Sequence, residues 1–115
     1  MFLATAINTN GNTTQYPSQI THVECPNVKI CANWAFNTCP QLKVIKLDNC
    51  ESLGQGVFDS NSDLTEIYIP KVKTIGHSCF AWGLANCPNI ELPSVENIGP
   101  SAFRETNLSK IILGS

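Results

Sequence analysis

The sequence has few charged residues, no basic run and no long apolar segment. Charged residues make up 14% of its 115 residues, and the net charge is −2. Without a cluster of Lys and Arg the chain lacks the electrostatic footprint of a nucleic-acid-binding protein, so we expect no nucleic-acid partner. No apolar stretch approaches the roughly 18 residues that a membrane-spanning helix needs, so we expect no membrane span.

The first 19 residues contain no Asp, Glu, Lys or Arg, and the first charged residue is Glu24. A secretory signal peptide begins with basic residues ahead of an apolar core, and this segment has no basic residue and only a short apolar start. Any export signal would therefore lie outside this chain or be of another kind. We interpret residues 1–19 as a polar leader or cap, and residues 20–115 as one repeat domain.

What the sequence does contain is a repeat. Phe36, Phe58, Phe80 and Phe103 are separated by 22, 22 and 23 residues. Other apolar positions keep the same spacing and form three further columns. These columns are Ile20, Leu42, Leu64, Cys87 and Leu108; Val23, Ile45, Ile67 and Ile90; and Cys25, Leu47, Ile69, Leu92 and Leu113. Aligned columns of this kind indicate stacked structural repeats.

The repeat predicts a β-rich solenoid with about 22–23 residues per coil. One such coil cannot bury its own apolar face, but stacked coils share a continuous core. The alternation of apolar and polar residues predicts a short strand in each coil, and stacked strands form a parallel sheet. We expect about four coils and a final strand, with each Phe on a short helical or 3-10 turn. A glycine follows the apolar residue that stands five positions before the Phe in three coils, at Gly54, Gly76 and Gly99. It predicts positive φ or a tight corner there.

The third coil departs from the regular spacing. We place Cys87 in the column that holds Leu in other coils, which leaves Trp82 to Asn86 as a local bulge. A rival alignment matches "NCPNI" to "TCPQL" and makes Ile90 equivalent to Leu42. The first alignment is preferred because it keeps the strand positions in register.

Three phrases of the sequence resemble the BspA-like type of leucine-rich repeat. They are "IPKVKTIGHSCF", "LPSVENIGPSAF" and "AFNTCPQLKVIKL", and the resemblance covers residues 20–113. The resemblance implies a non-enzymatic, adhesin-like module on a cell surface or outside the cell, which binds host proteins or other cells. It supplies no catalytic residue, metal ligand or cofactor, and fold alone does not define function.

The residues themselves give no stronger chemical signal. No Cys-x-x-Cys pair occurs, so we interpret the six cysteines as small buried apolar residues. One disulfide, or a zinc site recruiting His22 or His77, remains the alternative. The segment "DNCESLGQGVFDSNSD" lacks the regular acidic spacing of a calcium loop and is interpreted as a solvated acidic edge. We find no nucleophile–base pair, so we expect no enzyme activity and no cofactor.

The outward side chain of each predicted strand is the candidate partner-binding surface. This column reads Glu24, Lys46, Tyr68, Glu91 and Ile112. Repeat proteins bind partners over extended surfaces of stacked repeats, and Tyr is a common interface anchor. The alternative is a mixed, solvated sheet face. Trp34 and Trp82 are expected at the opposite edge, where exposed rings would form a second contact site.

The last strand is a candidate assembly edge. Leu108, Ile111 and Leu113 come just before the end of the sequence, and Ile112 adds an apolar side chain in the outward position. A solenoid that ends on an uncapped strand exposes both core and strand edge. The second hypothesis is therefore self-association, as a structural subunit of a larger assembly such as a virion or tail component. In that case the protein would be in a virion or the cytoplasm.

Overall fold

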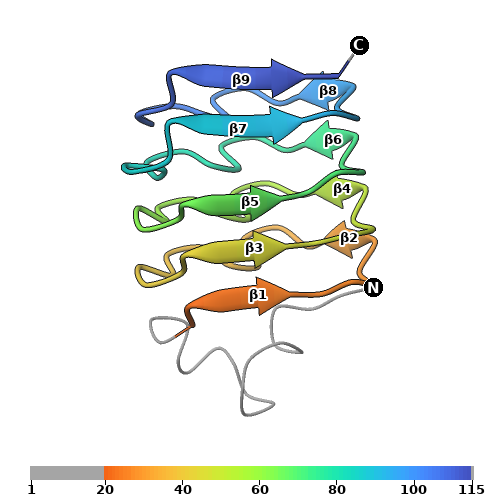
Figure 1. The fold of residues 1–115 in the computed structure, drawn as a ribbon, viewed down its shortest axis with the longest axis horizontal. Coiled ribbons are helices and arrows are strands. Elements are labelled where there is room, and N and C mark those ends of the chain that lie inside the picture. The colour runs from red at the N-terminus through yellow and green to blue at the C-terminus, as the bar shows by residue number, and fades with distance from the viewer. Residues whose placement is uncertain (1–19, 115) are drawn as a thin grey trace.

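The computed structural model describes residues 20–114, which form a solenoid of about four turns (Figure 1). The leader or cap predicted for residues 1–19 lies outside the described residues. Each turn of the solenoid contributes a front strand and, in all but the last, a back strand. The front strands are β1 (His22–Glu24), β3 (Val44–Lys46), β5 (Glu66–Tyr68), β7 (Asn89–Leu92) and β9 (Lys110–Leu113). The back strands are β2 (Ile30–Cys31), β4 (Ser52–Leu53), β6 (Thr74–Ile75) and β8 (Asn97–Ile98).

All strand pairing is parallel, as the repeat predicts. The back strands form one sheet in the order β2-β4-β6-β8, whereas the front strands form two sheets, β1-β3-β5 and β7-β9. Val23 is paired with Ile45 and Ile45 with Ile67, which is the predicted column. Ile90 is paired with Ile111, so the preferred alignment of the third coil is confirmed.

The core consists of the predicted apolar columns. Rings of Phe36, Phe58, Phe80 and Phe103 stack with centroids 5.4–5.5 Å apart, and the first three are buried. Parallel-displaced rings at this separation add to the stabilisation that burial itself gives. All six cysteines are free thiols, and five of them are buried. The interpretation of cysteine as a small core residue is confirmed at these five positions.

The predicted helical turn at each Phe is wrong, because the described residues contain no helix. Left-handed residues stand two positions before and two positions after the Phe, as at Trp34 (φ 62°) and Thr38 (φ 53°). They interrupt any run of helical dihedrals, since a helix needs consecutive right-handed residues. Alternate N–H groups bond instead to the next coil, for example Phe36 N–H to the Val57 carbonyl at 2.9 Å. The turns thus form a third ladder between coils.

Gly54, Gly76 and Gly99 do not adopt positive φ, so that part of the prediction is wrong. In the described residues, the glycine with positive φ is Gly56 (φ 62°). Gly54, Gly76 and Gly99 are instead required by close approach between coils. A Cβ on Gly76 would lie 2.6 Å from the backbone carbon of Gly54, and one on Gly99 would lie 2.8 Å from that of Gly76. Only a residue without a Cβ allows this spacing.

Candidate functional site: the front sheet face

The front face presents the outward column expected from the sequence. Strand alternation turns every second side chain away from the core. The five predicted residues are all exposed: Glu24, Lys46, Tyr68, Glu91 and Ile112. A second outward column lies two residues earlier on each strand and comprises His22, Val44, Glu66, Asn89 and Lys110. Tyr68 is the one aromatic residue among the ten.

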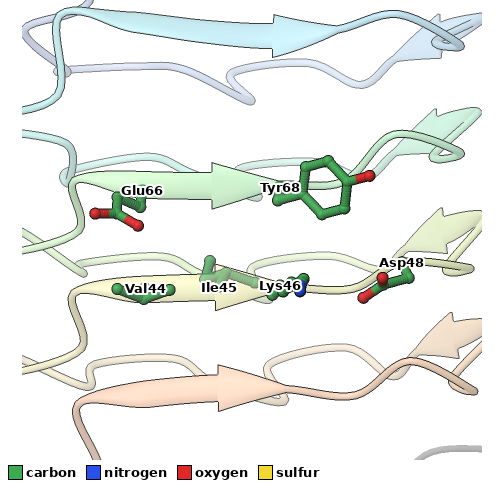
Figure 2. A pocket seen from close by; sticks show the side chains of 6 residues that line it. All are labelled: Val44, Ile45, Lys46, Asp48, Glu66 and Tyr68. Carbon is green, nitrogen blue, oxygen red and sulfur yellow. The ribbon is translucent and has the colours of Figure 1, made fainter.

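A recess of about 380 Å³ lies between β3 and β5, on the solvent side of the front sheet. Its lining combines apolar, charged and aromatic side chains: Val44, Ile45, Lys46, Asp48, Glu66 and Tyr68. Figure 2 shows Tyr68 and Glu66 at opposite ends of β5, with Val44 below them on β3. The Tyr68 side chain is 51% exposed. The recess is therefore an open, partly apolar depression in the face.

A second, smaller recess lies on the other side of Tyr68, between β5 and β7. Its volume is about 120 Å³, and its lining includes Tyr68, Glu91 and Pro93. The front ladder is interrupted between these two strands. In other coils the residue before the strand donates to the preceding coil, as Lys43 N–H does to Thr21 (2.8 Å).

In the fourth coil that position is Pro88, which has no N–H to donate. The Thr65 carbonyl is approached instead by the Cys87 thiol, at 3.8 Å. The start of β7 is thus not joined to β5 by this backbone hydrogen bond, and the two strands belong to different sheets. Sequence analysis located an irregularity in the preceding, third coil, at Trp82 to Asn86. That segment does contain Leu84, a left-handed residue with no counterpart in the other coils.

The charged side chains of this face are not used to hold the fold together. Within residues 20–114 there is one ion pair, and it lies away from the front sheet. It joins Lys29 Nζ to Glu51 Oε2 at 3.8 Å. Asp48, Glu66 and Glu91 therefore have no cation within salt-bridge distance in the described part of the chain. Lys46 is likewise unpaired there. These groups are available for contacts with another molecule.

The cysteines are poorly suited to nucleophilic chemistry. Burial raises the pKa of Cys79 to about 12 and that of Cys39 to about 11. The hydrogen bond between the Cys31 and Cys50 thiols raises the pKa of Cys31 and lowers that of Cys50. Both thiols are fully buried, so the Cys50 sulfur is shielded from reagents. No group of three or more potential metal ligands occurs among residues 20–114.

The other sequence candidates are dispersed. His22 and His77 are exposed and far apart along the chain. Trp34 and Trp82 are 46% and 54% exposed, at the turns rather than on the front face. The Trp34 ring lies against Gly56, and the Arg104 guanidinium lies 5.5 Å from the centre of the Trp82 ring. The two rings are thus partly covered by their own surroundings.

The candidate assembly edge is partly exposed. Ile111 and Leu113 are 39% and 59% exposed, whereas their counterparts one coil earlier, Ile90 and Leu92, are 2% and 0% exposed. Leu108, the third residue of this edge, is half-buried against the core. Ile112 is also exposed, at 38%.

Sequence analysis missed Asn61, a fully buried polar residue. Its Oδ1 accepts a hydrogen bond from Cys39 N–H (2.7 Å), and its Nδ2 donates one to the Phe36 carbonyl (3.1 Å). The side chain joins the second coil to the first. Sequence analysis interpreted this segment only by its acidic residues. Asn61 could have been identified as a polar residue at the position that Cys39 occupies in the first coil.

Comparison with known protein families gives one finding. Residues 6–109 match the model described as BspA type leucine-rich repeat region, in six copies. The search of curated proteins and the search of solved structures returned no match. In the described residues no helix has the length and apolar character needed to cross a membrane.

Proposed function

Because the chain belongs to the BspA-type leucine-rich repeat family, we propose that it is an adhesin-like module that binds a protein partner through its front sheet face. Repeats of this family are generally protein-binding, surface-associated and non-catalytic. The proposed partner is a protein on a host cell or another cell surface, and the proposed location is the cell surface or the extracellular space. The module has no enzymatic role in this proposal.

The observation that supports this proposal is the state of the front face around Tyr68. A half-exposed aromatic ring stands between two recesses, and the surrounding charged groups make no ion pairs within residues 20–114. Exposed aromatic side chains beside a depression are the usual anchors of protein interfaces. The back strands are only two residues long, so they present a shorter stretch of sheet than the front strands.

The test is binding of the labelled whole chain to a panel of intact cells, before and after protease treatment of the cell surface. Protease treatment should abolish binding, because the partner is a protein. A front variant, Glu66→Lys with Tyr68→Ala, should also lose most binding. A back variant, Glu96→Lys with Thr74→Ala, should bind like the wild type. Binding that survives protease treatment, or that falls equally in both variants, would contradict the proposal.

A structural role in a larger assembly is the second candidate. It is favoured by the exposed side chains of the last coil, whose counterparts in the preceding coil are buried. A second copy stacked on β9 would cover Ile111 and Leu113 and continue the parallel sheet. Light scattering over a concentration series tests it. A defined oligomer that dissociates in Leu113→Asp supports the assembly role, and a monomer at every concentration rules it out.

A further inference from the structure

The aromatic ring of Tyr68 has an acidic surrounding. Two of the three nearby carboxylates, Asp48 and Glu66, line the larger recess, and Glu91 lines the smaller one. Lys46, in the larger recess, is the one cationic residue in the two linings. Three negative charges and one positive charge leave a local net charge of −2 around one exposed ring. The face of an aromatic ring carries partial negative charge, so the ring and the carboxylates favour the same kind of ligand.

Figure 2 shows the Tyr68 ring broad side toward the viewer, in front of the sheet. Lys46 on β3 is the register partner of Tyr68, and Glu66 stands at the start of β5, the strand that ends with Tyr68. A group placed on the open side of the ring would thus lie between carboxylates on β5, on β7 and just beyond β3. This arrangement is a candidate site for a cationic group, and it is open to solvent.

We propose that this site receives an arginine side chain from an extended segment of the protein partner. The inference rests on the proposed function and adds the chemistry of the partner to it. A guanidinium group is planar, so it stacks on an aromatic ring while its edge N–H groups donate to carboxylates. Lysine offers a point charge without the planar edge, and it therefore fits the combination of ring and carboxylates less well.

Removing the charge of Lys46 should change the affinity in a direction that depends on the charge of the ligand. If the ligand is cationic, the Lys46 ammonium opposes it, and removing that charge should strengthen binding. If the face merely provides contact area, removal of Lys46 should weaken binding or leave it unchanged. The response to Lys46→Gln therefore separates recognition of a cation from general surface contact.

The experiment is a selection of random 12-residue displayed peptides on the whole chain, and each selected peptide is afterwards measured on the Tyr68→Ala variant as well. Selected peptides are then synthesised, labelled and measured by fluorescence anisotropy at low salt. Each peptide is also made with citrulline in place of arginine, because citrulline keeps the shape and removes the charge. We expect enrichment of arginine, and about tenfold weaker binding of the citrulline peptides, the scale of one strong cation–π and charge contact.

The protein variants carry matched charge changes. Glu66→Gln and Glu91→Gln should each weaken binding by about two- to fivefold at low salt, which is the range of exposed ion pairs. Glu96→Gln removes the same charge beside the back sheet and should leave affinity unchanged. Lys46→Gln should strengthen binding by about twofold. Tyr68→Leu keeps apolar bulk without a ring and should still bind weakly. Thermal unfolding of each variant verifies that the fold is retained.

The outcomes separate the two proposals. Arginine-containing peptides that are sensitive to Glu66→Gln and Glu91→Gln support the inference. Peptides that require Tyr68 but contain no basic residue, or that ignore both glutamate variants, overturn it and leave the proposed function standing. Peptides that bind the Tyr68→Ala variant equally well overturn the inference and argue against the front face as the binding surface. A selection that yields no binding peptide counts against both.

Discussion

The front and back of this solenoid are built from the same repeat but differ in continuity. The back strands β2, β4, β6 and β8 form one unbroken parallel sheet, whereas the front strands are divided between β5 and β7 (Figure 1). The back is adjacent to the column of Gly54, Gly76 and Gly99, where an added Cβ would meet the preceding coil. The front contains Pro88 at a donor position.

The difference shows which side sets the distance between coils. Close backbone approach at the glycines leaves no freedom for larger residues, so the back keeps a fixed spacing. The front has no such column. Its ladder is interrupted between β5 and β7, where the smaller recess lies beside Tyr68, while the back sheet stays continuous. The rigid side thereby supports the side that we propose for binding. Four substitutions test this comparison.

The largest effect is expected at the back, from Gly76→Val. A Cβ at this position would meet Gly54 backbone atoms at 2.6 and 2.7 Å, and backbone cannot move aside as a flexible side chain can. We expect a loss of about 3 kcal/mol or more in the free energy of unfolding, measured with urea. Thr74→Val, at an exposed position of β6 just before Gly76, should change stability by less than about 0.5 kcal/mol. A stable Gly76→Val protein would mean that coil spacing is not fixed at the glycines.

A smaller loss is expected from Asn61→Ala, which removes a link between the first two coils on the approach to β5. The substitution leaves the buried N–H of Cys39 without its acceptor. We expect destabilisation by about 1–3 kcal/mol, the cost of an unsatisfied buried polar group. Ser62→Ala, at an exposed neighbour, is the control. Equal stability of the two variants in urea unfolding would show that the Asn61 bonds contribute little.

The core thiols predict a decline of stability at high pH. The folded-state pKa of Cys79 is raised from 9.0 to about 12, so the unfolded chain releases this proton first. Its contribution is complete below pH 9 and is lost as the pH rises towards 12, at about 1.4 kcal/mol per pH unit. Cys79→Ala should flatten the pH dependence of urea unfolding between pH 9 and 10.5. An unchanged slope in this variant would show that Cys79 is not the group responsible.

The smallest effect is expected at the front, from Pro88→Ala. The new N–H can donate to the Thr65 carbonyl and close the ladder between β5 and β7. The new hydrogen bond stabilises the folded state, whereas loss of the proline makes the unfolded chain more flexible and so destabilises the fold. The two effects oppose each other, so stability should change by less than about 1 kcal/mol. Hydrogen exchange is the sensitive measurement, and the amides of Asn89 and Glu91 should exchange several-fold more slowly. Pro40→Ala, at another Cys-Pro pair, should leave them unchanged. Unaltered exchange in Pro88→Ala would mean that another feature separates the strands.

Sequence analysis predicted the coil length, the apolar columns and the outward column, because each depends on periodic burial that the pattern records directly. It predicted positive φ or a tight corner at Gly54, Gly76 and Gly99, and positive φ is wrong, since a glycine in a sequence does not show whether it serves positive φ or close approach. It also missed the left-handed backbone at Trp34 and Ser78, where neither residue type indicates that conformation. Ladder contacts between coils select it.

The candidate site was predicted only in outline. Tyr68 and its column follow from strand alternation, and all five outward residues are exposed as expected. The two recesses, and the grouping of Asp48, Glu66 and Glu91 with Tyr68, depend on the register between coils. These are properties of neighbouring coils rather than of one repeat, so the periodic pattern does not reveal them.

The left-handed turns have a consequence for how the chain folds. Among residues 20–114, eight non-glycine residues have positive φ, and all but Leu84 fall in two columns beside the phenylalanines. Each such conformation is disfavoured by on the order of 1 kcal/mol in an isolated segment. The compensating bonds run to the next coil, as from Ser78 N–H to the Pro100 carbonyl. A single repeat therefore cannot nucleate its own turn, and the shortest excised fragment able to fold is a stack of neighbouring coils.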